Sequence, residues 1–287
     1  MKKILILGAS GNLGICLKDS FSKYKPLAWD KMDLDLSDVA KTAAALEATK
    51  PSLIINAAAY NSVDLCERSD HEYELALKIN RDLPGFLADW CLERQALLVH
   101  FSSDYVFSSD DVNFKGFKEN DKPCPINRYG ESKLAGEEKI LALAKQGLNY
   151  YLIRTSKLFG PKGLSPDSKP NFFDIMLKLA KSQRELRIVS DENSCFTYTV
   201  DLAQAVLSMI LERPKSGIYH LINKKPATWL QGAEYLFDIF NLSPRIKEIE
   251  GEKLSRPAKR AKSSVLLNKK RPALRSWQEA LLDFYKK

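Results

Sequence analysis

The stretch that most constrains the fold of this chain is its first fourteen residues. Ile4 to Leu7 is a short, wholly apolar run, which is typical of a parallel strand buried on both faces. Three glycines follow in the spacing Gly8-x-x-Gly11-x-x-Gly14, and apolar residues then recur at helical spacing from Ile15 to Phe21. The order of strand, glycine turn and helix is the context that a dinucleotide-binding loop needs, because a helix N-terminus offers unpaired N–H groups to phosphate.

Each glycine has a physical reason to be there. Gly8 permits the tight turn, Gly11 lets the backbone approach a pyrophosphate, and Gly14 lets the helix pack close to the strand. An ordinary strand-to-helix turn also explains the pattern, so the rest of the chain must decide. For a dinucleotide loop, we expect cofactor contacts at Gly8, Ser10, Gly11, Asn12, Leu13 and Gly14.

Length and composition exclude several classes of protein. The 287 residues suffice for one large domain or one large and one small domain. No apolar run approaches the roughly 18 residues of a membrane span, and the N-terminus has no signal-peptide pattern. The five cysteines are scattered without a CxxC pair, and only three histidines are present. We therefore expect a cytoplasmic protein with reduced thiols, no membrane association and no metal site.

The net charge of +8 raises the question of a nucleic-acid partner. Much of the excess lies between Lys253 and Arg275, where aromatic residues are not interleaved with the basic ones. An anionic small substrate or a solvated basic face explains the charge as well. We expect no specific nucleic-acid binding.

The second predicted strand, Pro26 to Asp30, leads to a cofactor question that the sequence leaves open. Asp30 lies where a dinucleotide fold places the carboxylate for the adenosine ribose. Lys31 follows at once, and a cation there would receive a 2′-phosphate instead. The cofactor is therefore predicted as NADPH or NADH.

The segment after this strand has two interpretations. Ser37 is a plausible N-cap for a helix that continues to about Glu47. Asp35 and Leu36 either line the adenine pocket or merely end the strand and begin the helix.

Two further apolar strands end in residues suited to ligand contact. Pro51 to Asn56 runs into small residues that leave room for a ligand against the backbone, namely Ala57, Ala58, Ala59 and the following Tyr60. Leu97 to Phe107 carries two hydroxyls, Ser102 and Ser103, at a position where doubly wound folds bind ligands, although capping of the next turn is an alternative. His100 within this strand is predicted to be a core or hydrogen-bonded residue.

Tyr129 and Lys133 form a YxxxK pair near the start of a predicted helix that continues to about Ala144. Residues at i and i+4 share one helix face. A lone pair of this kind is common, but here it follows the serine-bearing strand by some 25 residues in a chain that begins with a nucleotide loop. The ordered combination is specific. Further along, Asn171 is expected to cap a helix to Lys181, and Asn80 to be a structural hydrogen-bonding residue in a long helix from Glu72 to Glu93.

At this point the chain resembles a known family, the dTDP-4-dehydrorhamnose reductases of the extended short-chain dehydrogenase/reductase superfamily. The resemblance covers nearly the whole chain and is carried by residues 8–14, 56–64, 101–107, 129–137 and 154–156, and more loosely by 171–172, 201–203 and 260–266. It implies an α/β fold with a Rossmann-type doubly wound parallel sheet and a smaller C-terminal lobe. Residues 1–160, completed by parts of 185–223, would bind NAD(P)H, and residues 161–184 and 224–287 would bind the substrate.

The resemblance also implies a catalytic set of Ser103, Tyr129 and Lys133, with Ser102 beside the cofactor. A free tyrosine has a pKa near 10, and a lysine cation nearby favours the phenolate and lowers that value. Tyr129 would protonate a ketone oxygen while Ser103 donates a hydrogen bond to it. Substrate contacts would come from Val63, Asp64, Ser103, Asp104, Tyr105, Lys157, Asn171 and Arg260.

The chain departs from the family pattern in the part expected to touch substrate. Ser103 replaces a threonine, Lys157 replaces an aromatic residue, and Arg260-Ala261 replaces an Arg-Pro pair. Residues 194–197 also differ from the usual Gly-x-Pro-Thr. Lys157 and Arg260 either meet a diphosphate or another anion, or are surface charges.

The sequence thus predicts an NAD(P)H-dependent reductase of a nucleotide-linked 4-keto-6-deoxy sugar. The best named reaction is dTDP-4-dehydrorhamnose to dTDP-L-rhamnose for surface polysaccharide, in a possible homodimer. A non-catalytic cofactor-binding regulatory subunit and a nucleotide-sugar epimerase or dehydratase are the alternatives.

Overall fold

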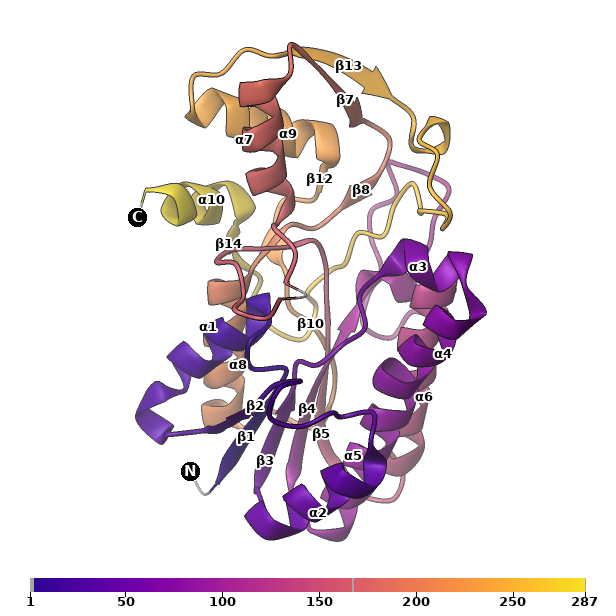
Figure 1. Ribbon diagram of the computed structural model, residues 1–287, viewed down its shortest axis with the longest axis vertical. Coiled ribbons are helices and arrows are strands. Elements are labelled where there is room, and N and C mark those ends of the chain that lie inside the picture. Colours follow the sequence, from indigo (N-terminus) through magenta and orange to yellow (C-terminus); the bar gives the residue numbers. More distant parts are fainter. Residues whose placement is uncertain (1–2, 167, 287) are drawn as a thin grey trace.

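The computed structural model describes residues 3–166 and 168–286 of the chain, and a parallel sheet forms its centre (Figure 1). Six parallel strands lie in the order β2-β1-β3-β4-β5-β10. Their bounds are β1 Ile4–Leu7, β2 Leu27–Trp29, β3 Leu53–Asn56, β4 Leu97–Ser103, β5 Asn149–Thr155 and β10 Gly217–His220. The strand order reverses between β1 and β3, so the doubly wound α/β class predicted from the sequence is confirmed.

Helices cover both faces of this sheet, which is why its strands read as continuous apolar runs. One face packs against α1 (Asn12–Ser20) and α8 (Thr199–Glu212). The other packs against α2 (Val39–Thr49), α5 (Leu83–Glu93) and α6 (Arg128–Ala144). Two short helices, α3 (Val63–Arg68) and α4 (Asp70–Leu77), follow β3 near the upper end of α6 in Figure 1.

Three local expectations need correction. The strand predicted to reach Phe107 ends at Ser103, because residues 104–106 form a 3-10 turn. The helix predicted from Glu72 to Glu93 exists, but a π-helical turn at residues 78–82 divides it into α4 and α5. The N-cap of α2 is Asp38 and not Ser37, because the Ser37 hydroxyl donates to Asp35 while Asp38 accepts from the backbone of Lys41.

Asn80 lies in the π turn and is fully buried. Its amide nitrogen donates to the carbonyl oxygen of Tyr60 (2.9 Å) and to the hydroxyl of Ser132 (3.0 Å), and its amide oxygen accepts from the Tyr60 N–H (3.0 Å). The predicted structural role of Asn80 is confirmed. It ties the loop after β3 to helix α6.

A second, smaller group of elements forms the opposite end of the molecule around its own apolar core (Figure 1). It contains α7 (Phe172–Ser182), α9 (Trp229–Ile239), α10 (Trp277–Tyr285) and the parallel pair β7 (Glu185–Val189) and β13 (Arg245–Ile249). Short strand pairs lie between the two ends, namely β6 (Leu158–Phe159) with β9 (Thr197–Tyr198), β8 (Asn193–Ser194) with β12 (Ala227–Thr228), and β11 (Asn223–Lys224) with β14 (Leu274–Ser276).

Two predictions for this end are confirmed. The side chain of Asn171 accepts hydrogen bonds from the first turn of α7, so it is the N-cap. The terminal helix docks through Trp277, Ala280 and Leu281, all of which are buried. In the described part of the chain, none of the helices combines the length and the apolar character that crossing a membrane requires.

Candidate active site

The predicted cofactor residues gather at the carboxyl edge of the sheet. The glycine loop follows β1, Asp30 follows β2, Ala57 to Tyr60 follow β3, and Ser102 and Ser103 end β4. The carboxyl ends of parallel strands lie at one edge, and the strand order reverses there between β1 and β3, which is where doubly wound folds bind their ligands. The fold therefore brings together segments that are far apart in the sequence.

The glycine loop is built for close approach. Gly8 has a left-handed φ of +72°, and a Cβ there would lie 2.7 Å from the backbone nitrogen of Ala58. A Cβ on Gly14 would lie 2.1 Å from the carbonyl oxygen of Gly8. Helix α1 begins after Gly11 without a side-chain cap, so its first N–H groups face the loop unpaired by any capping side chain. These features fit the pyrophosphate of a dinucleotide.

Unpartnered hydroxyls support the same fit. The side-chain oxygens of Ser102 and Thr155, at the ends of β4 and β5, are buried without a hydrogen-bond partner in the described chain. Such groups are rare in native proteins because each one loses its hydrogen bonds to water. Both lie at the edge where a nicotinamide and its ribose would bind, and they would supply polar contacts there.

Residues between β6 and α7 contact the glycine loop. The backbone N–H of Gly163 donates to the Asn12 side chain (2.8 Å), and that of Leu164 donates to the carbonyl oxygen of Ser10 (2.7 Å). The Asn12 amide nitrogen donates to the carbonyl oxygen of Lys169 (3.1 Å). Ser10 and Asn12 therefore hold residues 163–165 and Lys169 in place, which leaves the backbone N–H groups of Asn12 and Leu13 for phosphate.

The contacts of the residues after β2 bear on the role of Asp30 and on the two interpretations of Asp35 and Leu36. Asp30 accepts a hydrogen bond from the backbone of Met32 (2.8 Å), with Lys31 beside it. Asp35 accepts from Ser37, whose hydrogen bonds hold the pKa of that carboxyl below its usual value. Leu36 packs into the core on the α5 side of the sheet, which favours a structural role for this side chain.

Ser103, Tyr129 and Lys133 come together at the end of β4 and the start of α6. The Tyr129 ring is buried and meets Tyr105 edge to face at a centroid distance of 5.3 Å. Burial raises the pKa of the Tyr129 phenol, while its hydrogen bond with Ser103 lowers it. We expected Lys133 to lower this pKa, but burial dominates and the Lys133 ammonium donates to the carbonyl oxygen of Phe101 (2.8 Å). A phenol that keeps its proton at neutral pH is suited to donate it.

Lys133 itself is buried, and desolvation lowers its pKa to about 8, with Glu137 acting in the opposite direction. His100 is fully buried, and its Nδ1 accepts from the amide nitrogen of Asn56 (3.1 Å). Burial and the nearby Lys133 cation lower the pKa of His100, so its ring is neutral. The prediction that His100 is a hydrogen-bonded core residue is confirmed.

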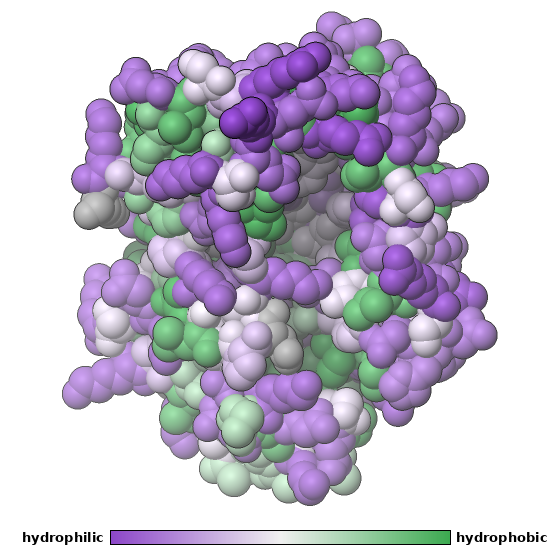
Figure 2. Space-filling view, turned by 45° about the horizontal axis from the view of Figure 1, so that its top comes forward, coloured by the Kyte–Doolittle hydropathy of each residue, from purple (hydrophilic) through white to green (hydrophobic). Residues whose placement is uncertain are grey.

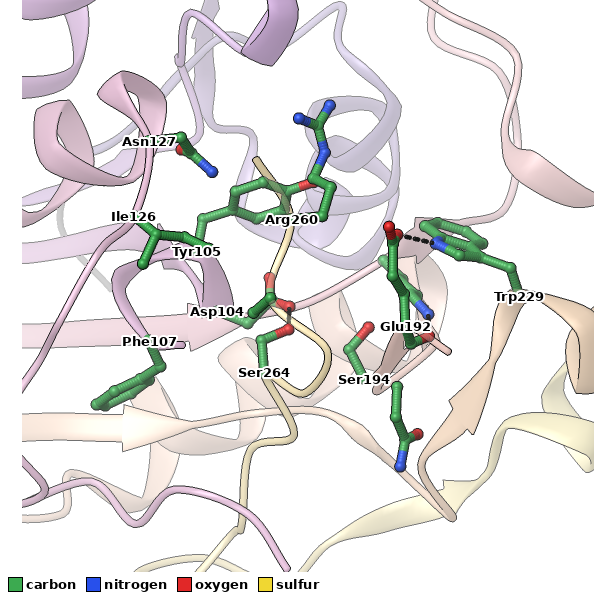
Figure 3. Close-up of a pocket in the computed structure, with 13 residues that line it drawn as sticks. Asp104, Tyr105, Phe107, Ile126, Asn127, Glu192, Ser194, Trp229, Arg260 and Ser264 are labelled. Carbon is green, nitrogen blue, oxygen red and sulfur yellow. Dashed lines mark hydrogen bonds between the residues drawn. The ribbon is translucent and has the colours of Figure 1, made fainter. Parts of the chain in front are cut away.

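Beyond Ser103, Tyr129 and Lys133, a cavity of about 190 Å³ lies between the two ends of the molecule. Figure 2 shows that the surface is hollowed there, with mainly hydrophilic side chains around the rim. Figure 3 shows Asp104, Tyr105 and Arg260 on one side of the cavity, and Glu192 and Trp229 on the other. The sequence analysis missed Asn127, Glu192 and Trp229, because no spacing pattern relates them to the other site residues.

Asp104 connects several segments of the cavity wall through hydrogen bonds. Its carboxylate is buried and accepts hydrogen bonds from three hydroxyls, those of Ser103 (3.2 Å), Ser156 (2.7 Å) and Ser264 (2.6 Å). Burial raises its pKa, and these hydrogen bonds oppose that rise. One carboxylate thus links β4, the end of β5 and the C-terminal segment.

The other predicted substrate residues lie in different settings. Arg260 pairs with Asp64 (3.1 Å) above the ring of Tyr105, and Val63 begins the helix that carries Asp64. Asn171 lies away from the cavity lining, and its amide nitrogen donates to the carbonyl oxygen of Gly160 (3.1 Å). Its polar atoms already serve the cap of α7.

Lys157 lines the cavity and is not a surface charge. Its ammonium lies 3.9 Å from the ring centre of Trp229 and donates long hydrogen bonds to the carbonyl oxygens of Ala227 (3.3 Å) and Glu192 (3.4 Å). Its backbone has a left-handed φ of +34°, which is unusual for a residue with a side chain. Desolvation lowers the pKa of Lys157 to about 8.

Known proteins share this architecture over its whole length. The sequence profile of the RmlD substrate binding domain matches residues 1–287. A dTDP-4-dehydrorhamnose reductase of Burkholderia thailandensis is 33% identical over 285 residues, which is 93% of this chain and 90% of the relative. The chain belongs to the dTDP-4-dehydrorhamnose reductase family. The spore coat polysaccharide biosynthesis protein SpsK of Bacillus subtilis is also 33% identical, over 290 residues that make up 99% of this chain and 97% of that protein.

Solved structures agree with this family membership. A dTDP-4-dehydrorhamnose reductase from Bacillus anthracis, in complex with NADP, superimposes with a TM-score of 0.89 at 30% identity and covers 99% of both chains. A UDP-glucose 4-epimerase from Thermus thermophilus in complex with NAD has a TM-score of 0.78 at 17% identity, covering 93% of this chain and 90% of that one. The epimerase shares the fold, and its reaction says nothing about this family member.

Proposed function

We propose that this protein is an NAD(P)H-dependent reductase that converts dTDP-4-dehydrorhamnose to dTDP-L-rhamnose for polysaccharide biosynthesis. The observation that carries the proposal is the juxtaposition of Ser103, Tyr129 and Lys133 with the glycine loop at one edge of the sheet. Reductases of this sugar are among the relatives that cover most of the chain, and a related structure holds NADP. The protein would then act on a nucleotide-linked sugar, consistent with its family.

The chain's own residues would perform the protonation. The nicotinamide, when bound, supplies the hydride to the ketone carbon. Tyr129 holds its proton in the buried site and would donate it to the ketone oxygen, while Ser103 donates a hydrogen bond to the same oxygen. The Lys133 cation would stabilise the phenolate that Tyr129 becomes. Burial is thus useful, because it keeps Tyr129 protonated before the reaction.

We further propose that separate parts of the chain bind the cofactor and the nucleotide sugar, as the sequence predicts. Residues 1–160 with parts of 185–223 would bind the cofactor, and 161–184 with 224–287 would bind the nucleotide sugar. The placement of β10 in the central sheet and of α8 against one face of it, and of Lys157, Trp229 and Arg260 around the cavity, supports this division. A homodimer and a cytoplasmic location remain part of the proposal.

The test follows the absorbance of NADPH and NADH at saturating dTDP-4-dehydrorhamnose, made in situ. Wild type is expected to oxidise cofactor, and Tyr129→Phe to lose about two to four orders of magnitude of rate, because the proton donor is removed. Tyr73→Phe, which removes a surface hydroxyl that bonds Glu131, is the matched control and should keep the rate. Cofactor that binds to wild type but is never oxidised would refute the reductase and favour a non-catalytic regulatory subunit.

A further inference from the structure

Most charges around the cavity are paired with a charge of opposite sign. Glu192 forms an ion pair with Arg256 and also accepts from the Trp229 indole (3.1 Å). Arg260 is paired with Asp64. These pairs satisfy their own charges and hold the cavity wall together, so they leave little charge for a ligand.

Two groups of the wall lack such a partner. The Asp104 carboxylate is bonded only to serine hydroxyls, and the Lys157 ammonium only to two carbonyl oxygens and the face of Trp229. Within residues 3–166 and 168–286, neither of them lies within salt-bridge distance of an opposite charge. They are nevertheless close enough to attract each other. The cavity thus presents a hydrogen-bond acceptor and a donor with a gap between them.

The acceptor still has room for a ligand. A carboxylate offers about four lone-pair sites, and Asp104 uses two of them on one oxygen for Ser156 and Ser264. Its other oxygen accepts only from Ser103, at 3.2 Å. The donor is held in position by its contacts, because the Lys157 ammonium lies over the Trp229 ring and donates to the carbonyl oxygens of Glu192 and Ala227.

A sugar hydroxyl matches this arrangement, because it donates one hydrogen bond and accepts another. Ser103 contacts Asp104 and is also proposed to contact the ketone oxygen. Its single hydroxyl proton, which Asp104 accepts in the structure, would turn to the ketone oxygen when the sugar binds, and this frees the Asp104 oxygen for a hydroxyl on a carbon next to the ketone. In a 4-keto-6-deoxy sugar only C3 carries a hydroxyl there, since C5 carries the methyl group. Resting on the proposed function, we propose that Lys157, together with Asp104, binds the C3 hydroxyl of the sugar and makes Lys157 a specificity-determining residue.

The experiment compares the parent dTDP-linked 4-keto-6-deoxy sugar with its 3-deoxy analogue, in wild type and Lys157→Met. Hydrogen bonds to charged groups correspond to roughly 10- to 150-fold in kcat/KM. Wild type should discriminate against the 3-deoxy sugar by about that factor, and Lys157→Met should lose most of the discrimination by becoming slower on the parent sugar alone. Lys157→Gln keeps an N–H donor and should retain part of the discrimination against the 3-deoxy sugar. Lys145→Met, at an exposed lysine, is the control and should behave as wild type.

An equal loss on both sugars in Lys157→Met would overturn the proposal, because Lys157 would then not sense the hydroxyl. A wild-type preference for a 6-carboxylate sugar that disappears in the variant would also overturn it, in favour of an anion site. Calorimetry with dTDP-L-rhamnose and its 3-deoxy analogue, in the presence of NADP⁺, separates this inference from the proposed reaction. Suppose that no keto sugar is reduced, but that wild type binds dTDP-L-rhamnose more tightly than the 3-deoxy analogue while Lys157→Met binds both equally. The proposed reductase activity would then be refuted, and the proposed hydroxyl site would be supported.

Discussion

Replacing Lys157 by methionine should make the protein more stable at neutral pH. In the folded chain the pKa of Lys157 falls from 10.5 to about 8 because the ammonium is desolvated. Each pKa unit corresponds to about 1.36 kcal/mol, so keeping this lysine charged at pH 7 costs the folded state about 3 kcal/mol. Methionine loses the cation–π contact with Trp229, worth about 1 to 2 kcal/mol. The expected net gain is about 1 to 2 kcal/mol.

The pH dependence has a definite sign. Between pH 8 and 10.5 the unfolded wild type binds more protons at this lysine than the folded one, so wild-type stability rises with pH relative to the variant. The gain of Lys157→Met should therefore shrink by up to about 1.4 kcal/mol per pH unit above pH 8.

Urea unfolding at pH 7 and 9.5 measures this difference in stability. Far-ultraviolet circular dichroism is the suitable probe, because tryptophan fluorescence would also report the altered contact at Trp229. Lys145→Met, at an exposed lysine, should change stability by less than about 0.5 kcal/mol at either pH. A variant less stable than wild type at pH 7, or a gain that is the same at both pH values, would refute the reasoning. A confirmed gain together with lost sugar discrimination would mean that function maintains this costly residue.

Three further predictions concern the central sheet, the glycine loop and helix α6. Glu137→Gln should lower the free energy of unfolding, measured in urea, by about 3 to 5 kcal/mol, because it leaves the buried Arg154 guanidinium without its negatively charged partner. A loss no larger than for the exposed Glu185→Gln would count against this. Gly14→Ala should abolish NADPH binding in a fluorescence titration, since its Cβ would lie 2.1 Å from the Gly8 oxygen. A normal affinity for NADPH would show that the glycine loop does not bind the cofactor. The kcat/KM of wild type should fall above about pH 8 as Lys133 loses its charge, and a flat profile to pH 10 would contradict its role.

The class of fold could be predicted from the sequence, and so could the candidate catalytic residues Ser103, Tyr129 and Lys133, because both depend on local patterns. A buried strand needs an apolar run, a phosphate loop needs glycines at set spacings, and Tyr129 and Lys133 share a helix face through their i, i+4 relation. The same locality explains the errors. The competition between Ser37 and Asp38 for the α2 cap, and the end of β4 at Ser103, were decided by individual hydrogen bonds that no pattern encodes.

The cavity between the two ends of the molecule became visible in the folded structure alone. Its wall combines β4, the end of β5, the β8 region, α9 and the C-terminal segment, which no sequence spacing relates to one another. The sequence left Lys157 as either an anion-binding residue or a surface charge, and the structure shows it as a desolvated hydrogen-bond donor near Asp104. The structure also reverses the expected direction of the Tyr129 pKa, because burial depends on what packs around a side chain and not on its neighbours in sequence.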